Sequence, residues 1–179
     1  MRRWNAVLTG AILVLFLVHA ILGGFQLLGV GSTAVKVIAR ICVCLIAVHM
    51  VLGIKLTADT VKVWKRTGVS YIRENTLFWA RRISGLAVMV LLVFHLTAFG
   101  VGSGAQYRLA WFDMAKLITQ LLLIASLALH ILSNVRPMLI SFGIRSLRER
   151  VGDILVILSV VLLFLAAAFI VYYLRWNSF

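Results

Sequence analysis

The chain has 179 residues, of which 63% are hydrophobic and 13% charged, and its formal net charge is +13. Soluble domains have roughly 45–50% apolar and about 25% charged residues, so this composition excludes a soluble globular fold. It indicates one domain, residues 1–179, with the lipid bilayer as its solvent. The cysteines, Cys42 and Cys44, form neither a CxxC nor a CxxCH motif, which disfavours a thiol redox site, a zinc site or covalently attached haem.

Five apolar segments are long enough to cross a membrane, since a helix needs about 20 apolar residues to span the hydrocarbon core. In chain order they cover residues 6–29, 34–54, 83–102, 112–133 and 152–174. Each is expected to be a helix, because lipid offers no partner for an unpaired backbone. The stretch Lys55–Arg82 is too charged to span and is expected at the headgroup level. The sequence therefore predicts an all-α, five-helix integral membrane bundle.

The basic residues indicate an orientation. With the N-terminus inside, 13 of the 18 lysine and arginine residues lie on the inner side and 5 on the outer side. Cytoplasmic loops carry the excess of such residues, so we expect a multi-pass protein of the cell membrane with a cytoplasmic N-terminus and an external C-terminus. The positive charge is then mostly topological, and nucleic acid is not expected as a partner.

Each of the first four segments carries one histidine: His19, His49, His95 and His130. Ionisable residues inside a membrane are costly and usually functional. At 1.5 Å per residue, His19 and His95 lie about 20 Å from the inner ends of their helices, and His49 and His130 about 9 Å. A haem iron takes axial ligands from two sides, so two helices must offer imidazoles at equal depth. The sequence predicts two haem b groups, an outer one between His19 and His95 and an inner one between His49 and His130.

Three other interpretations of these histidines are open. They can be structural residues that join helices by hydrogen bonds, ligands of zinc or copper, or members of a proton relay. The separation of the pairs in depth disfavours a common metal ion, since no cysteine or carboxylate joins them. A relay is disfavoured because no intramembrane carboxylate extends it.

The first four segments repeat a two-helix pattern. Both halves contain a small-residue pair, a histidine nine or ten positions later, and a His-x-x-x-Gly/Asn-x-Lys/Arg sequence. The matched residues are Thr9-Gly10, His19 and His49–Lys55 in the first half, and Ser84-Gly85, His95 and His130–Arg136 in the second. The small residue four after histidine lets porphyrin or a neighbouring helix approach.

The basic residue that ends each repeat, Lys55 or Arg136, can reach a haem propionate near the interface. Arg40 is a further candidate for haem binding, on the outer side. The last segment, 152–174, carries no histidine and is expected to pack against the others or to face lipid.

The sequence Leu-Phe-Trp-Ala-Arg-Arg-Ile-Ser-Gly-Leu at 77–86, with His95 beyond it, resembles the Arg-x-Ser/Thr-Gly helix start of the membrane-anchor cytochrome b subunits of succinate dehydrogenases and fumarate reductases. The segments that begin at His49 and His130 resemble the haem-ligand pattern His-x-x-x-Gly-x-Arg of those anchors. The resemblance implies an electron-transfer subunit with flavoprotein and iron–sulfur partners on the cytoplasmic face. It also implies menaquinone or another quinone as the substrate in the membrane.

One departure leaves an alternative open. In five-helix members of that family the ligands fall on the first, second, fourth and fifth helices, whereas here they occupy the first four. This pattern is similar to cytochrome b561, in which consecutive helices carry alternating ligands of two haems. The alternative function is a stand-alone carrier that passes electrons to an extracytoplasmic acceptor.

Two places are candidates for quinone binding. On the outer side, Asp113 offers a proton acceptor beside Tyr107 and Trp111, although a carboxylate there also suits the first turn of a helix. On the inner side, Arg82 and Ser84 match the part of the resembling anchors that binds quinone, and they equally suit membrane topology and propionate pairing. The sequence does not choose between the two places.

Overall fold

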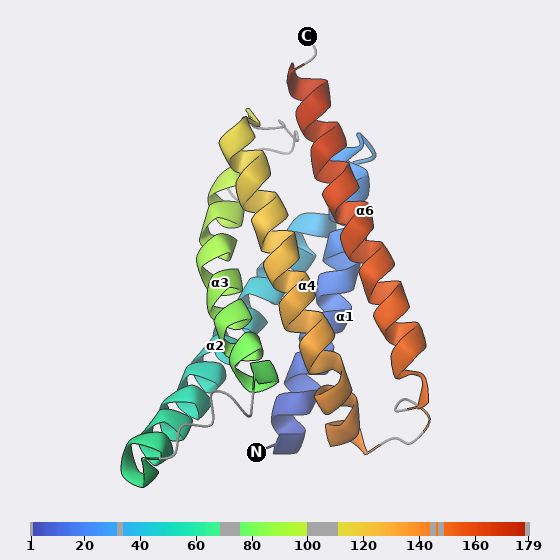
Figure 1. The fold of residues 1–179 in the computed structure, drawn as a ribbon. Helices are drawn as coiled ribbons and strands as arrows, with labels where there is room; N and C mark the ends of the chain where they lie inside the picture. Colours follow the sequence, from blue (N-terminus) through green and yellow to red (C-terminus); the bar gives the residue numbers. More distant parts are fainter. Residues whose placement is uncertain are drawn as a thin grey trace.

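A computed structural model describes residues 2–31, 34–68, 76–99, 111–143, 146 and 149–177. Five long helices make up most of this part of the chain (Figure 1). They are α1 (Arg2–Leu27), α2 (Ala34–Thr67), α3 (Thr76–Phe99), α4 (Met114–Phe142) and α6 (Val151–Asn177). None of the described residues lies in a strand. The prediction of an all-α five-helix fold is therefore confirmed.

The surface of the bundle is apolar. All five helices are long and apolar enough to span a membrane, and large side chains such as Leu163, which is 70% exposed, point outward from them. Water would penalise an exposed apolar surface of this extent, whereas lipid does not. α1 begins and α6 ends at opposite ends of the bundle, as expected of an odd number of crossings (Figure 1). The chain is thus a multi-pass membrane protein.

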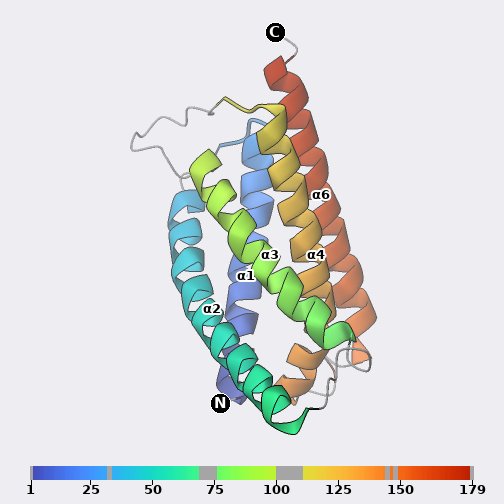
Figure 2. The ribbon, with the colours of Figure 1, turned by 60° about the vertical axis from the view of Figure 1, so that its left-hand side comes forward.

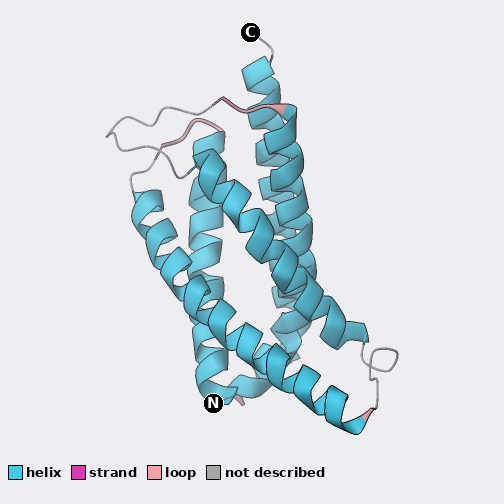
Figure 3. Cartoon of the chain, turned by 90° about the vertical axis from the view of Figure 1, so that its left-hand side faces the viewer, coloured by secondary structure: helices cyan, strands magenta, loops and turns pink. Residues whose placement is uncertain are grey.

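The second helix is longer than the sequence predicts. We expected it to end at residue 54, but α2 continues to Thr67 and has 34 residues. Such a helix is about 51 Å long, against about 30 Å of hydrocarbon. The extra part, residues 55–67, projects past the other helices at the lower left of Figure 1, and Figure 3 shows α2 running obliquely past its neighbours. The prediction that the second helix ends at residue 54 was therefore wrong. Hydropathy marks where a helix leaves the membrane, whereas backbone hydrogen bonding decides where the helix ends.

α4 also extends beyond its predicted span of 112–133, and local chemistry accounts for both of its ends. The Asp113 carboxylate accepts a hydrogen bond from the Lys116 amide at 2.8 Å, which caps the first turn. At the other end, Gly143 adopts φ 72°, which an L side chain rarely allows, and its amide donates to the Ile140 carbonyl. Pro137 lies inside the helix and does not end it.

The helices pack as two hairpins and a covering helix (Figure 2). α1 packs on α2 and α3 on α4, so each half of the sequence repeat forms one hairpin, and α6 covers α1 and α4. In the described part of the chain, neither α1 with α3 nor α2 with α4 is a closely packed pair. One face of α6 is buried, comprising Leu158, Leu162, Leu165, Phe169 and Tyr172. Its other face is exposed at Val156, Val160 and Leu163, so α6 both packs and faces lipid.

Candidate functional site

The four histidines form two pairs inside the bundle, and each pair joins helices that are not closely packed on one another. The ring centroids of His19 on α1 and His95 on α3 are 6.2 Å apart, with ring planes at 89°. Those of His49 on α2 and His130 on α4 are 6.4 Å apart, with ring planes at 74°. These are the pairs that equal depth in the membrane predicts.

The spacing within each pair suits a shared metal ion. A metal–imidazole bond is about 2.0 Å and a ring centroid lies about 1.15 Å behind its ligating nitrogen, so two trans imidazoles have centroids about 6.3 Å apart. The observed 6.2 Å and 6.4 Å agree with this distance. Rotating either ring about its metal bond leaves the distance unchanged, so the observed angles between the ring planes are compatible with it.

Hydrogen bonds fix which nitrogen is free on one histidine of each pair. The Nδ1 atom of His95 lies 2.8 Å from Oε1 of Gln120, and that of His130 lies 3.2 Å from the carbonyl oxygen of Arg81. An amide or carbonyl oxygen can only accept, so Nδ1 carries the proton in both rings. Nε2 then keeps its lone pair. Metal-bound histidines almost always donate their second ring N–H in this way.

The other histidine of each pair has an unpaired nitrogen. The Nδ1 atoms of His19 and His49 are buried and have no hydrogen-bond partner among the described residues. Buried polar atoms are nearly always paired, so such atoms call for an explanation, and a metal ion bound directly by this nitrogen is one. Each pair offers two protein ligands, which is the number that a haem iron needs, because porphyrin supplies the other four. The residues of both pairs therefore fit a bis-histidine haem.

Two glycines that follow the histidines on α1 and α2 have open space beside them. Gly23 and Gly53 lie four residues after His19 and His49, and a Cβ atom added to either glycine would have no atom of the described residues within 4 Å. From the sequence, a small residue four positions after histidine lets either a neighbouring helix or porphyrin approach. Among the described residues no helix comes within 4 Å of such a Cβ, although the Arg82 side chain of α3 reaches the Gly53 carbonyl oxygen; that the space admits porphyrin stays a prediction.

Two arginines from the start of α3 flank the inner pair. Arg81 donates from Nε to the Ser133 carbonyl at 3.0 Å, and Arg82 donates from Nη1 to the Gly53 carbonyl at 3.3 Å. Arg82 also lies over the Phe78 ring, 5.0 Å from its centroid. These contacts join α3 to both α4 and α2. A guanidinium has five N–H donors, so both arginines are chemically able to bind a carboxylate as well.

The inner quinone candidates therefore lie beside the inner histidine pair. Ser84 is buried, and its Oγ is 3.3 Å from Nδ1 of His130. Arg82 reaches the carbonyl of Gly53, four residues after His49. Ser84 and Arg82 can thus serve the histidine pair, a nearby quinone, or both.

Lys55, Arg136 and Arg40 are exposed on the surface of their helices, and their contact with haem stays a prediction. Tyr107 lies outside the described residues. Trp111 is 67% exposed, and its carbonyl accepts a hydrogen bond from the Lys116 ammonium group.

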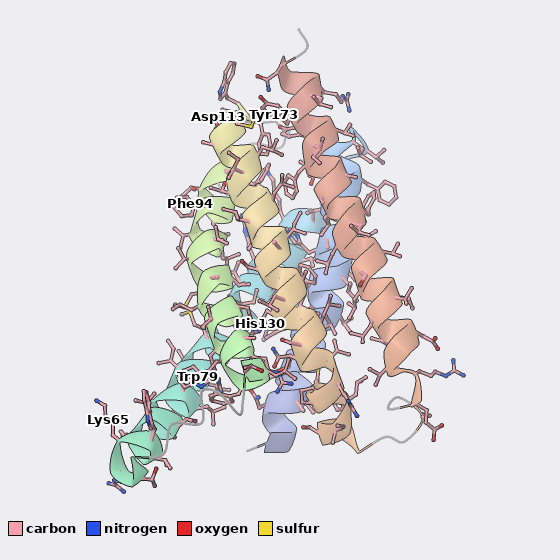
Figure 4. The ribbon with its side chains drawn as sticks, in the orientation of Figure 1. Lys65, Trp79, Phe94, Asp113, His130 and Tyr173 are labelled. Atoms are coloured by element: carbon pink, nitrogen blue, oxygen red, sulfur yellow. The ribbon has the colours of Figure 1, made fainter. Side chains whose placement is uncertain are left out.

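Asp113 lies at the N-terminal end of α4 (Figure 4), where it is the N-cap. The interpretation of this carboxylate as a capping group is confirmed by its hydrogen bond to the Lys116 amide at 2.8 Å. Its role toward quinone is a separate matter and stays a prediction.

Sequence reasoning missed Gln120 and Gly85. Gln120 has no exposed surface, and Gly85 lies so close to His130 that an added Cβ would be 3.1 Å from Cε1 of the ring. A signal for Gln120 was present, since an amide within an apolar span is uncommon. Gly85 was noted only as half of the Ser84-Gly85 pair. Its counterpart Gly10 faces Phe142, so the sequence repeat is not reproduced in these contacts.

Comparisons of the chain with protein-family models, with curated proteins and with solved structures find no match. The fold and the site define an all-α, multi-pass membrane protein with two intramembrane histidine pairs.

Proposed function

We propose that this protein is a di-haem cytochrome b that carries electrons within the membrane. We further propose that it is the haem b membrane-anchor subunit of a quinone-linked complex of the succinate dehydrogenase or fumarate reductase type. The observation that carries the proposal is the spacing of two histidine pairs, 6.2 Å and 6.4 Å, at two depths of one bundle. When bound, each haem would accept and release one electron.

The protein's own residues would hold the two centres in series. Gln120, which contacts His95, precedes His130 by ten residues on α4, a rise of about 15 Å. The outer and inner pairs are therefore displaced from each other along the bundle. The hydrogen bonds at Nδ1 of His95 and His130 hold the two rings in one tautomer, which removes a source of disorder from the site.

The projecting part of α2 supports a soluble partner on the inner face. It carries exposed Lys55, Lys62, Lys65 and Arg66, and Figure 4 shows Lys65 at its tip, at the opposite end of the bundle from Asp113. A basic surface attracts an acidic protein, and this attraction weakens as the salt concentration rises. With the N-terminus inside, as the charge distribution indicates, this helix end reaches into the cytoplasm. It suits the docking of flavoprotein and iron–sulfur subunits.

A second function, the stand-alone carrier of the cytochrome b561 type, is favoured by one observation. The first and third helices face each other through His19 and His95, and the second and fourth through His49 and His130. Alternating pairing of this kind is what that family implies. Isolation from native membranes separates the two functions, since co-purifying flavoprotein and iron–sulfur subunits support the anchor, and their absence supports the carrier.

The test of both functions is an absorption spectrum. Protein purified from a haem-replete host is expected to show b-type bands in the reduced-minus-oxidised spectrum. It should contain about two haems per chain, extractable by acid acetone because no thioether bond holds them. Colourless protein from such a host would refute both functions.

The pairing has its own test. His19→Ala and His95→Ala are each expected to remove the outer spectral component, and His49→Ala and His130→Ala the inner one, because that haem would then be held by one histidine and not two. Haem content should fall from about two to about one per chain in all four variants. If His19→Ala and His49→Ala abolish the same component, the pairing is refuted.

A further inference from the structure

Gln120 is enclosed in the apolar interior of the bundle. Its side chain has no exposed surface, and its neighbours in sequence, Leu117, Leu123 and Ile124, belong to the buried core. Its Oε1 accepts the hydrogen bond from Nδ1 of His95 at 2.8 Å. The other end of the amide, Nε2, is buried and has no partner among the described residues.

This arrangement is poor for stability alone. A buried donor without a partner destabilises a fold, and leucine, of nearly the same size, would suit an apolar core better. What Gln120 contributes is the hydrogen bond to His95. That bond holds one tautomer of the ring and directs the lone pair of Nε2 away from the amide.

We propose that Gln120 is the positioning residue of the outer histidine pair and lowers the reduction potential of the metal centre held there. The inference rests on the proposed function. A hydrogen bond from the distal ring nitrogen makes imidazole a stronger electron donor, which stabilises the oxidised metal. The amide oxygen of Gln120 supplies this bond to His95.

The inner pair is built differently. His130 donates to the Arg81 carbonyl over a longer distance, 3.2 Å, with the Ser84 hydroxyl 3.3 Å away. The cationic side chains of Arg81 and Arg82 lie on the same turn of α3, and nearby positive charge favours the reduced, less positive state of a metal centre. The outer centre should therefore have the lower potential, and electrons should pass from the outer pair to the inner one, toward the basic end of α2.

The experiment is a redox titration of the purified holoprotein, followed in the visible spectrum. The outer component is identified as the one that His19→Ala removes. Gln120→Leu is expected to raise the midpoint of the outer component and leave the inner midpoint unchanged. Gln120→Glu, which keeps an acceptor oxygen, should hold the outer midpoint at or below the wild-type value. Thr119→Val is the matched control, since the Thr119 hydroxyl donates to the Lys116 carbonyl of its own helix and, among the described residues, makes no bond to a histidine.

Gln120→Met also removes the amide oxygen, and its flexible side chain adapts to the space if the leucine variant does not fold. An unchanged outer midpoint in both apolar variants, with haem bound, overturns this inference and leaves the proposed function standing. An equal shift of both midpoints overturns it too, because that would indicate a general disturbance of the bundle. Wild-type protein without haem would overturn the inference and the proposed function together.

Discussion

Replacing Gly85 by alanine should loosen the inner histidine pair selectively. The added Cβ would lie 3.1 Å from Cε1 and 3.3 Å from Nδ1 of His130. Carbon atoms in optimal contact are about 3.5–4.0 Å apart, so the ring must retreat by about 0.5 Å. That retreat also disturbs the hydrogen bond from Nδ1 to the Arg81 carbonyl, now 3.2 Å.

The size of the effect follows from the overlap. Over-packing a well-packed interior by one methyl group costs about 1–3 kcal/mol. At about 1.4 kcal/mol for each tenfold change, this corresponds to roughly 5- to 150-fold weaker retention of haem between His49 and His130. Alanine also favours the helical state over glycine by about 1 kcal/mol. This gain stabilises α3 as a whole and does not relieve the contact with the His130 ring.

The assay is competition for haem between the purified variant and a soluble haem-binding protein, with the inner component identified through His49→Ala. Gly152→Ala is the control, since an added Cβ at Gly152 on α6 meets no atom within 4 Å in the part of the chain that the structure describes. Gly85→Ala should release the inner component faster than the wild type, and the control should not. If Gly85→Ala retains both haems as firmly as the wild type, the close approach of His130 to Gly85 is not what holds the ring.

The remaining predictions concern the two ends of the bundle. Asp113→Asn keeps a good N-cap, whereas Asp113→Ala should cost about 0.5–2 kcal/mol in thermal or denaturant unfolding, because it removes the hydrogen bond to the Lys116 amide. The Asp113→Asn variant should oxidise quinol more slowly than the wild type. If its rate is normal and the Ser84→Ala variant has lost turnover, the quinone binds on the inner side. The double variant Lys65→Glu, Arg66→Glu should co-purify less of the soluble subunits, most clearly at low salt, and should keep both haem spectra. If co-purification is undiminished, this end of α2 is not the docking surface.

The structure confirms the fold class predicted from the sequence and corrects several of the predicted helix bounds. The class of fold and the membrane spans followed from the length of the apolar runs, because a lipid-exposed backbone must form helices. Three helix bounds did not follow: α2 ends at Thr67 and not at residue 54, α3 begins at Thr76 and not at residue 83, and α4 ends at Phe142 and not at residue 133. α2 continues through charged residues such as Lys62, because a charged side chain does not interrupt backbone hydrogen bonding, and α4 continues past Arg136 into a further apolar stretch whose Leu139 is buried.

The sequence by itself also predicted the depth of each histidine, because the predicted depth depends on the 1.5 Å rise per residue and on where the basic residues begin. Depth alone predicted that His19 belongs with His95 and His49 with His130. The neighbours of each ring were decided by the tertiary structure. Whether Gln120 meets His95, or Gly85 meets His130, depends on how each helix is rotated about its axis and on which helix packs against it. The rotation of each helix and the choice of its packing partner are set by side-chain packing between segments that are distant in the sequence. Hydropathy and residue spacing along one helix carry no information about that packing.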